Sequence, residues 1–151
     1  EFTKYAESKG VKVFYVTNRG AETEKDTREN MAKLGFPMGG NVDTFLMQGE
    51  KPEWTGAKST RRTAIAKDYR ILLNIGDNLG DFDDRYRSSE SDRVKVFEAA
   101  MPYWGKQWLM LANPTYGSFD TSPYGHDFKK PRGEQRKAKW DVLESWSGPT
   151  P

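Results

Sequence analysis

The sequence predicts an α/β fold in which helices flank a largely parallel sheet. Short apolar runs that favour β-strands alternate with longer amphipathic stretches, which is typical of βα units. A polar loop follows each short run, and the chain contains no repeat and no low-complexity tract. At 151 residues the chain has the length of one ordinary domain. We therefore predict a single domain over residues 1–151, with a core in residues 1–125 and a basic tail in residues 126–151.

The short apolar runs are too short for ordinary helices, so we expect them to be strands. These strands are expected at residues 11–16, 44–47, 71–75 and 108–111. Helices are expected at residues 22–34, 58–69 and 92–104. The first ten residues look like the last turns of a helix that ends at Gly10, and Gly35 marks the end of the helix over residues 22–34. Towards the end of the chain we predict a loop at residues 113–125, then a basic segment at residues 129–139 that ends in a helix near Trp140.

The composition excludes several classes of function. Lys and Arg total 24 against 22 Asp and Glu, and the net charge of +2 creates no broad field for nucleic acid or a membrane surface. We therefore expect no nucleic-acid partner. The absence of cysteine excludes disulfides, thiolate zinc sites and cysteine nucleophiles. His126 is the only histidine, which argues against histidine-nucleophile phosphatases, two-histidine zinc hydrolases and Ser-His-Asp enzymes.

Polar side chains follow the predicted strand at residues 11–16. Ligands of open α/β sheets collect beyond the carboxyl ends of the strands, so these residues are candidates for a binding site. Thr17, Asn18 and Arg19 lead into Gly20 and the start of a helix. A hydroxyl and an amide there can hold a phosphate oxygen. The alternative is that Thr17 or Asn18 only caps the next turn, and this stretch alone leaves both interpretations open.

Lys58 lies at the predicted start of the helix over residues 58–69. A lysine at a helix N-terminus opposes the helix dipole, so an anion bound nearby would explain its position. The alternative is a solvated surface lysine. Arg61 and Arg62 compete for the same anion-binding role.

Two carboxylates follow the predicted strand at residues 71–75. Asp77 comes directly after Gly76, and Asp81 is four residues further on, a spacing that places two side chains on one side of a helical turn. Mg²⁺ prefers oxygen ligands and usually takes one or two carboxylates together with waters and substrate phosphate. We predict that Asp77 is the ligand and that Asp81 orients water or neutralises a lysine. The alternative is that both aspartates are helix caps or turn formers.

The three polar segments, in this order and at these separations, resemble motifs two, three and four of the haloacid dehalogenase phosphatases. The wider sequence is similar to the class C acid phosphatases in the segments EFTKYAESKGVKVFYVTNR, ENMAKLGFP, RILLNIGDNLGDF and GKQWLMLANPTYGSF. These are bacterial enzymes, often secreted or lipid-anchored. The resemblance implies a Rossmann-like fold, a magnesium-dependent phosphomonoesterase activity and a periplasmic, outer-membrane-anchored or secreted location for the full-length protein.

The resemblance also implies roles for the candidate residues. Thr17 and Lys58 bind the transferring phosphoryl group, with Asn18 beside them. Asp77 ligates Mg²⁺, and Asp81 supports it. Arg19 and Tyr116 belong to the substrate side, where an aromatic ring stacks on the base of a nucleoside 5'-monophosphate. For Tyr116, local packing in its Gly- and Pro-rich loop is the alternative.

Enzymes of this family attack phosphorus with an aspartate, and a second aspartate two residues later protonates the leaving oxygen. That pair should follow an apolar strand upstream of residues 13–16, where this chain has no such residues. Asp81 and Asp83 are rejected as the pair because they lie after motif four and do not directly follow a strand. We therefore expect the central first strand to be absent from this chain and to come from a further N-terminal segment or a second chain. The 151 residues alone are expected to be inactive.

Two other functions stay open at this stage. One is a non-catalytic storage or binding relative of the same fold, which the missing aspartates would permit. The other is a different haloacid dehalogenase hydrolase or phosphotransferase, which the same motifs could serve. A homodimer is also left open.

Overall fold

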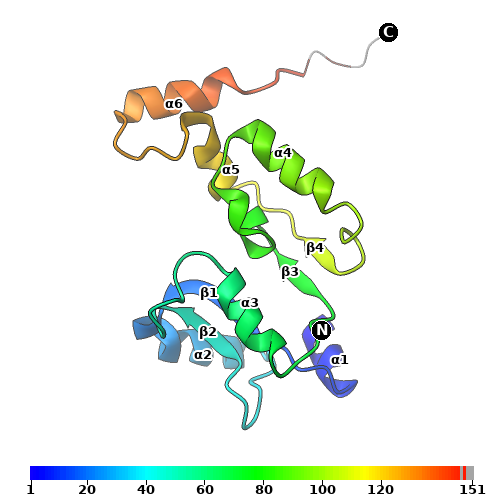
Figure 1. The fold of residues 1–151 in the computed structure, drawn as a ribbon. Coiled ribbons are helices and arrows are strands. Elements are labelled where there is room, and N and C mark those ends of the chain that lie inside the picture. Colours follow the sequence, from blue (N-terminus) through cyan, green and yellow to red (C-terminus); the bar gives the residue numbers. More distant parts are fainter. Residues whose placement is uncertain (147, 149–151) are drawn as a thin grey trace. The chain divides into compact units, whose positions relative to one another are not determined.

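The computed structural model describes residues 1–146 and 148. The chain forms two compact units, Glu1–Ile71 and Leu72–Pro151, each described by itself (Figure 1). The first unit contains α1 (Phe2–Ser8), β1 (Tyr15–Gly20), the 3₁₀ turn η1 (Ala21–Thr23), α2 (Glu24–Lys33), β2 (Phe45–Gln48) and α3 (Ser59–Ala66). The second unit contains β3 (Asn74–Gly76), η2 (Leu79–Asp81), η3 (Asp84–Tyr86), α4 (Glu90–Ala99), β4 (Trp108–Met110), α5 (Ser118–Thr121), η4 (Ser122–Tyr124) and α6 (Arg132–Asp141). The prediction of one domain with a basic tail stays a prediction.

The strands of the described residues form two parallel pairs, β1 with β2 and β3 with β4. Parallel pairing with helices between the strands confirms the α/β prediction. In the first unit, Figure 1 shows α2 and α3 beside the β1–β2 pair, and in the second α4 lies beside the β3–β4 pair. Two separate pairs are also what we expect if the central strand is not among these residues.

Two predicted strands are displaced in the structure. β1 begins at Tyr15 rather than at residue 11, because its ladder with β2 starts where the amide of Tyr15 donates to the carbonyl of Thr44 (2.8 Å). It also runs on to Gly20, so residues 17–19 are extended and not a loop, and the register shifts between Val16 and Gly20. β3 begins at Asn74 rather than at residue 71, because its partner β4 begins only at Trp108.

The predicted helices are present, with corrected ends. Gly10 and Gly35 follow α1 and α2 with φ of 78° and 75°, the left-handed conformation that ends a helix. α4 ends at Ala99 and not at residue 104, because Pro102 lacks an amide donor and disfavours helix in the residue before it. The predicted loop at residues 113–125 is wrong in part, since α5 and η4 lie within it. α6 confirms the helix expected near Trp140.

Each unit has its own core. In the first, Phe45 and Met47 of β2 are fully buried, and the ring of Tyr15 packs on that of Phe45 with centroids 4.7 Å apart. In the second, Phe82 packs against the rings of Trp104 and Trp108 at 4.9 and 5.4 Å. Among the described residues, no helix has the length and apolar character needed to span a membrane.

Candidate active site

The carboxyl half of β1 is anchored by a buried arginine. Arg61 of α3 is fully buried. Its Nη1 donates to the backbone carbonyls of Thr17 and Leu46, and its Nη2 donates to those of Thr55 (2.7 Å) and Ala57 (3.2 Å). A planar guanidinium can bind several carbonyls at once, which an ammonium group does less well. Arg61 therefore joins both strands of the first sheet to the residues that precede α3.

Asn18 takes part in the same network. Its Oδ1 accepts from Nη2 of Arg61 (2.6 Å), and its Nδ2 donates to the carbonyl of Gly56 (2.8 Å). Both ends of this amide thus bind protein groups and hold β1 against the residues before Lys58. The structure shows this positioning role, and contact of Asn18 with phosphate stays a prediction.

Thr17 and Arg19 lie on the same stretch of β1. The Oγ1 of Thr17 accepts from the backbone amide of Arg19 (3.2 Å), while Nη1 of Arg19 donates to Oγ1 of Thr27 in α2 (3.3 Å). The Thr17 side chain is half-buried, whereas Arg19 is exposed. The hydroxyl of Thr17 keeps its own proton as a donor for an oxyanion.

Lys58 is the N-cap residue of α3, one position before the first helical residue. Its side chain does not cap the helix, and the first turn contains no acidic residue. Because Arg61 and Asn18 bind the carbonyls of residues 55–57, they bring the start of α3 to the same edge of the sheet as Thr17. The structure thus brings Thr17, Asn18 and Lys58 together within the first unit.

Asp81 organises the loop that carries Asp77. One carboxylate oxygen of Asp81 accepts from the backbone amides of Asp77 and Asn78, each at 3.0 Å. Asn78 in turn accepts the amide of Gly80, which completes a capping box at the start of η2. A side chain at Gly76 would place its Cβ 2.4 Å from the Cβ of Asp81, so glycine is required there. Asp81 therefore acts as a helix cap, as the alternative interpretation predicted. Its carboxylate also fixes the backbone of Asp77.

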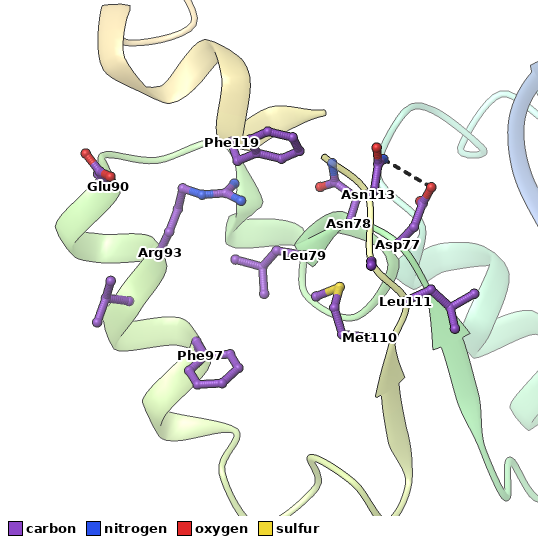
Figure 2. Close-up of a pocket in the computed structure, with 12 residues that line it drawn as sticks. Asp77, Asn78, Leu79, Glu90, Arg93, Phe97, Met110, Leu111, Asn113 and Phe119 are labelled. Carbon is purple, nitrogen blue, oxygen red and sulfur yellow. Dashed lines mark hydrogen bonds between the residues drawn. The ribbon is translucent and has the colours of Figure 1, made fainter. Parts of the chain in front are cut away.

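Asp77 is exposed at the end of β3, and its Oδ2 accepts from Nδ2 of Asn113 (3.1 Å) (Figure 2). Asn113 also donates to the carbonyl of Tyr116 (2.8 Å). The Asn113 amide therefore connects the candidate metal ligand to the loop of Tyr116, whose side chain is 70% exposed. An exposed ring in that loop is available for stacking, and its contact with substrate stays a prediction.

The candidate magnesium site offers one protein ligand, Asp77, and not a complete set of ligands. Within residues 1–146 and 148, no group of three or more His, Asp or Glu side chains is arranged to hold a metal ion. Mg²⁺ commonly takes one or two carboxylates and completes its octahedron with water and phosphate. The Asp77 carboxylate, exposed and oriented by Asn113, suits such a ligand. The structure places Asp77, Asp81 and Tyr116 in the second unit.

Sequence reasoning missed two residues of this site. Asn113 lies in the predicted loop at residues 113–125, although it follows the apolar run that contains β4, where strand-end ligands are expected. Asn78 was also overlooked, and its Oδ1 accepts from the hydroxyl of Ser118 (2.7 Å) as well as from Gly80. Gly117, with φ of 149°, leaves room for Asn78, because a Cβ at Gly117 would lie 2.1 Å from its Nδ2. The strand-end rule would have found Asn113.

Replacing Asp81 by alanine tests the capping role. Asp81→Ala removes the acceptor of two backbone amides, and we expect it to lower the free energy of unfolding by about 1–2 kcal/mol. Urea unfolding followed by circular dichroism measures this change. Asp68→Ala is the matched control, because Asp68 is exposed just after α3 and should change stability by less than ~0.5 kcal/mol. Equal unfolding midpoints for the two variants would contradict the assignment.

Comparisons with known proteins define the family. A model of the acid phosphatases of subfamily IIIB of the HAD superfamily matches residues 1–119. The chain therefore belongs to this family. Two solved structures of the class C acid phosphatase from Bacillus anthracis, one with tungstate bound, are similar to it at 32% sequence identity, with TM-scores of 0.85 and 0.86. Each match covers 97% of this chain and 60% of the other, so the chain spans about 60% of the length of these relatives.

Proposed function

We propose that this chain is the phosphate- and metal-binding part of an acid phosphatase that releases inorganic phosphate from phosphomonoesters. The match of residues 1–119 to the acid phosphatase family carries this proposal. Tungstate in one matched structure supports it, because tungstate is a tetrahedral oxyanion of the same shape as phosphate.

The first unit binds the phosphoryl oxygens. The Thr17 hydroxyl donates to one oxygen, and the Lys58 ammonium offsets the charge of the phosphate. Asn18 and Arg61 position these two groups by holding the end of β1 against the residues before α3. A preorganised donor set of this kind needs little rearrangement when charge develops on the phosphoryl oxygens.

The second unit holds the metal ion. Asp77 is the protein ligand, Asn113 orients its carboxylate, and Asp81 fixes its backbone. Mg²⁺, when bound, neutralises phosphate charge and orients the oxygens for displacement. The nucleophilic aspartate and its acid–base partner are proposed to come from a segment outside these 151 residues. We further propose nucleoside 5'-monophosphates as substrates, with the exposed ring of Tyr116 stacked on the base, and a periplasmic, outer-membrane-anchored or secreted location.

Removal of metal tests the proposal. The product of the complete reading frame, dialysed against a chelator, is expected to lose phosphate release from p-nitrophenyl phosphate by more than ~100-fold, because the metal supplies several kcal/mol of charge stabilisation. Added Mg²⁺ should restore the activity, which inorganic phosphate assays measure. The 151-residue chain alone should release no phosphate with or without Mg²⁺. Full activity after chelation would contradict the metal assignment, and no activity under any condition would favour the non-catalytic alternative.

A further inference from the structure

The second unit contains an open apolar groove between α4 and β4, with a volume of about 450 Å³ (Figure 2). Apolar side chains line most of it: Leu79, Val94, Phe97, Met110, Leu111 and Phe119. Figure 2 shows Met110 pointing from β4 towards α4, with Phe119 at one end of the groove. The groove lies beside Asp77 but is made mainly by residues that the proposed reaction does not use.

α4 has two apolar sides, and only one is covered. Val96 and Ala100, four residues apart, are buried in the core at 5% and 7% exposure. Val94, Phe97 and Met101 follow one another at spacings of three and four, yet remain 50%, 44% and 56% exposed. Such a spacing places Val94 and Phe97 on one side of α4, and Met101 lies just beyond its last residue, Ala99. Apolar stripes of this kind on a soluble protein mark a surface that another element covers.

The groove also has a charged end. Arg93 is partly buried, and its Nη1 donates to the carbonyl of Tyr86 and to the hydroxyl of Ser118 (2.7 Å). Among the described residues, its Nε and Nη2 donate to no acceptor. Burial lowers the pKa of Arg93, an effect that nearby Glu90 opposes. An acidic or carbonyl group on whatever fills the groove would therefore be bound favourably at this end.

We propose that this groove binds an apolar polypeptide segment of the same protein, from the part that corresponds to the length of the relatives outside the match. The matches include 97% of this chain but only 60% of each solved relative, so those proteins contain further chain outside the matched part. A helical stripe of apolar residues facing an apolar strand is the geometry that accepts an amphipathic helix in a groove. A carboxylate on the segment meets Arg93.

The absence of cysteine provides a direct test. Val94→Cys places a single thiol in the groove, and Glu98→Cys places one on an exposed position of the same helix that does not line it. The reaction rate of each thiol with a disulfide reagent is measured in the 151-residue chain and in the product of the complete reading frame. The Val94→Cys thiol should react at least ~10-fold more slowly in the longer protein, because protection follows the accessible population. The Glu98→Cys thiol should react at similar rates in both.

Met110→Cys, on the β4 wall, is a second reporter that should show the same protection. The readout needs no phosphatase activity, so its failure is distinct from failure of the proposed function. Equal rates for Val94→Cys and Met110→Cys in both proteins, or a reading frame that adds no residues, would overturn the proposal. Protection that rises with the concentration of the 151-residue chain would assign the groove to a second copy instead. Protection by phenyl phosphate would assign it to a small ligand.

Discussion

Replacing Asp77 by asparagine is expected to reduce phosphate release by the product of the complete reading frame more than ~100-fold, since the variant loses the negative charge proposed to bind the metal. The structure indicates that the fold would be retained. Asp77 is exposed, and the amide oxygen of asparagine can still accept the hydrogen bond from Nδ2 of Asn113. Loss of activity would therefore report on charge and not on unfolding.

Two measurements separate these effects. Initial rates with p-nitrophenyl phosphate over a range of Mg²⁺ concentrations should show that Asp77→Asn needs far more metal, or reaches no activity at all. Circular dichroism and urea midpoints should match those of the parent. Asp68→Asn, which removes an exposed carboxylate elsewhere, should keep parental rates and parental metal dependence. Parental activity of Asp77→Asn at low Mg²⁺ would remove Asp77 from the metal site.

The order and type of the main elements followed from local patterns, but their boundaries did not. Residues 11–16 have the composition of a strand, and yet β1 begins at Tyr15, because a strand extends only where a neighbour offers a ladder. That neighbour, β2, is about thirty residues away in the chain and is not visible to a local pattern. By contrast, Gly10 and Gly35 were predictable as helix ends, because the left-handed conformation is a local requirement that glycine meets.

In the candidate site, too, the local features could be predicted from the sequence and the long-range contacts could not. The cap formed by Asn78 and Asp81 is local. A helix cap was one of the two roles that the sequence left open for Asp81, beside support of a metal site. The hydrogen bond from Asn113 to Asp77 joins residues 36 positions apart, so no local pattern predicts it, and only the rule that ligands gather at strand ends would have indicated Asn113. Lys58 was correctly placed at a helix start, because helix N-termini have local signals.

Arg61 was the residue that sequence reasoning placed least well. The sequence predicts Arg61 only as a competitor of Lys58 for a bound anion, because it lies near the start of the same helix. In the structure it is fully buried and donates to carbonyls of residues 17, 46, 55 and 57. These acceptors come from three separate segments, so the burial of Arg61 depends on tertiary structure that a single sequence does not reveal.

Replacing Arg61 by methionine is accordingly expected to lower the free energy of unfolding of the first unit by about 3–5 kcal/mol. Methionine keeps much of the aliphatic volume, but it leaves the carbonyls of Thr17, Thr55 and Ala57 without the donors that now satisfy them. Lysine is expected to recover only part of the loss, because one ammonium group cannot replace both Nη1 and Nη2, which donate to different sets of carbonyls.

Native-state hydrogen exchange of the β2 amides measures this loss for the first unit alone. Protection at Leu46 and Met47 should fall by ~10²–10⁴-fold in Arg61→Met, the equivalent of the expected free energy at about 1.4 kcal/mol per tenfold change. Lys67→Met, an exposed basic residue just after α3, should leave protection unchanged. If Arg61→Met kept parental protection, the carbonyls would have found other donors, and the end of β1 would not depend on Arg61. If protection falls as expected, the backbone at Thr17 and before Lys58, the two residues proposed to bind phosphate, depends on the buried cation of Arg61.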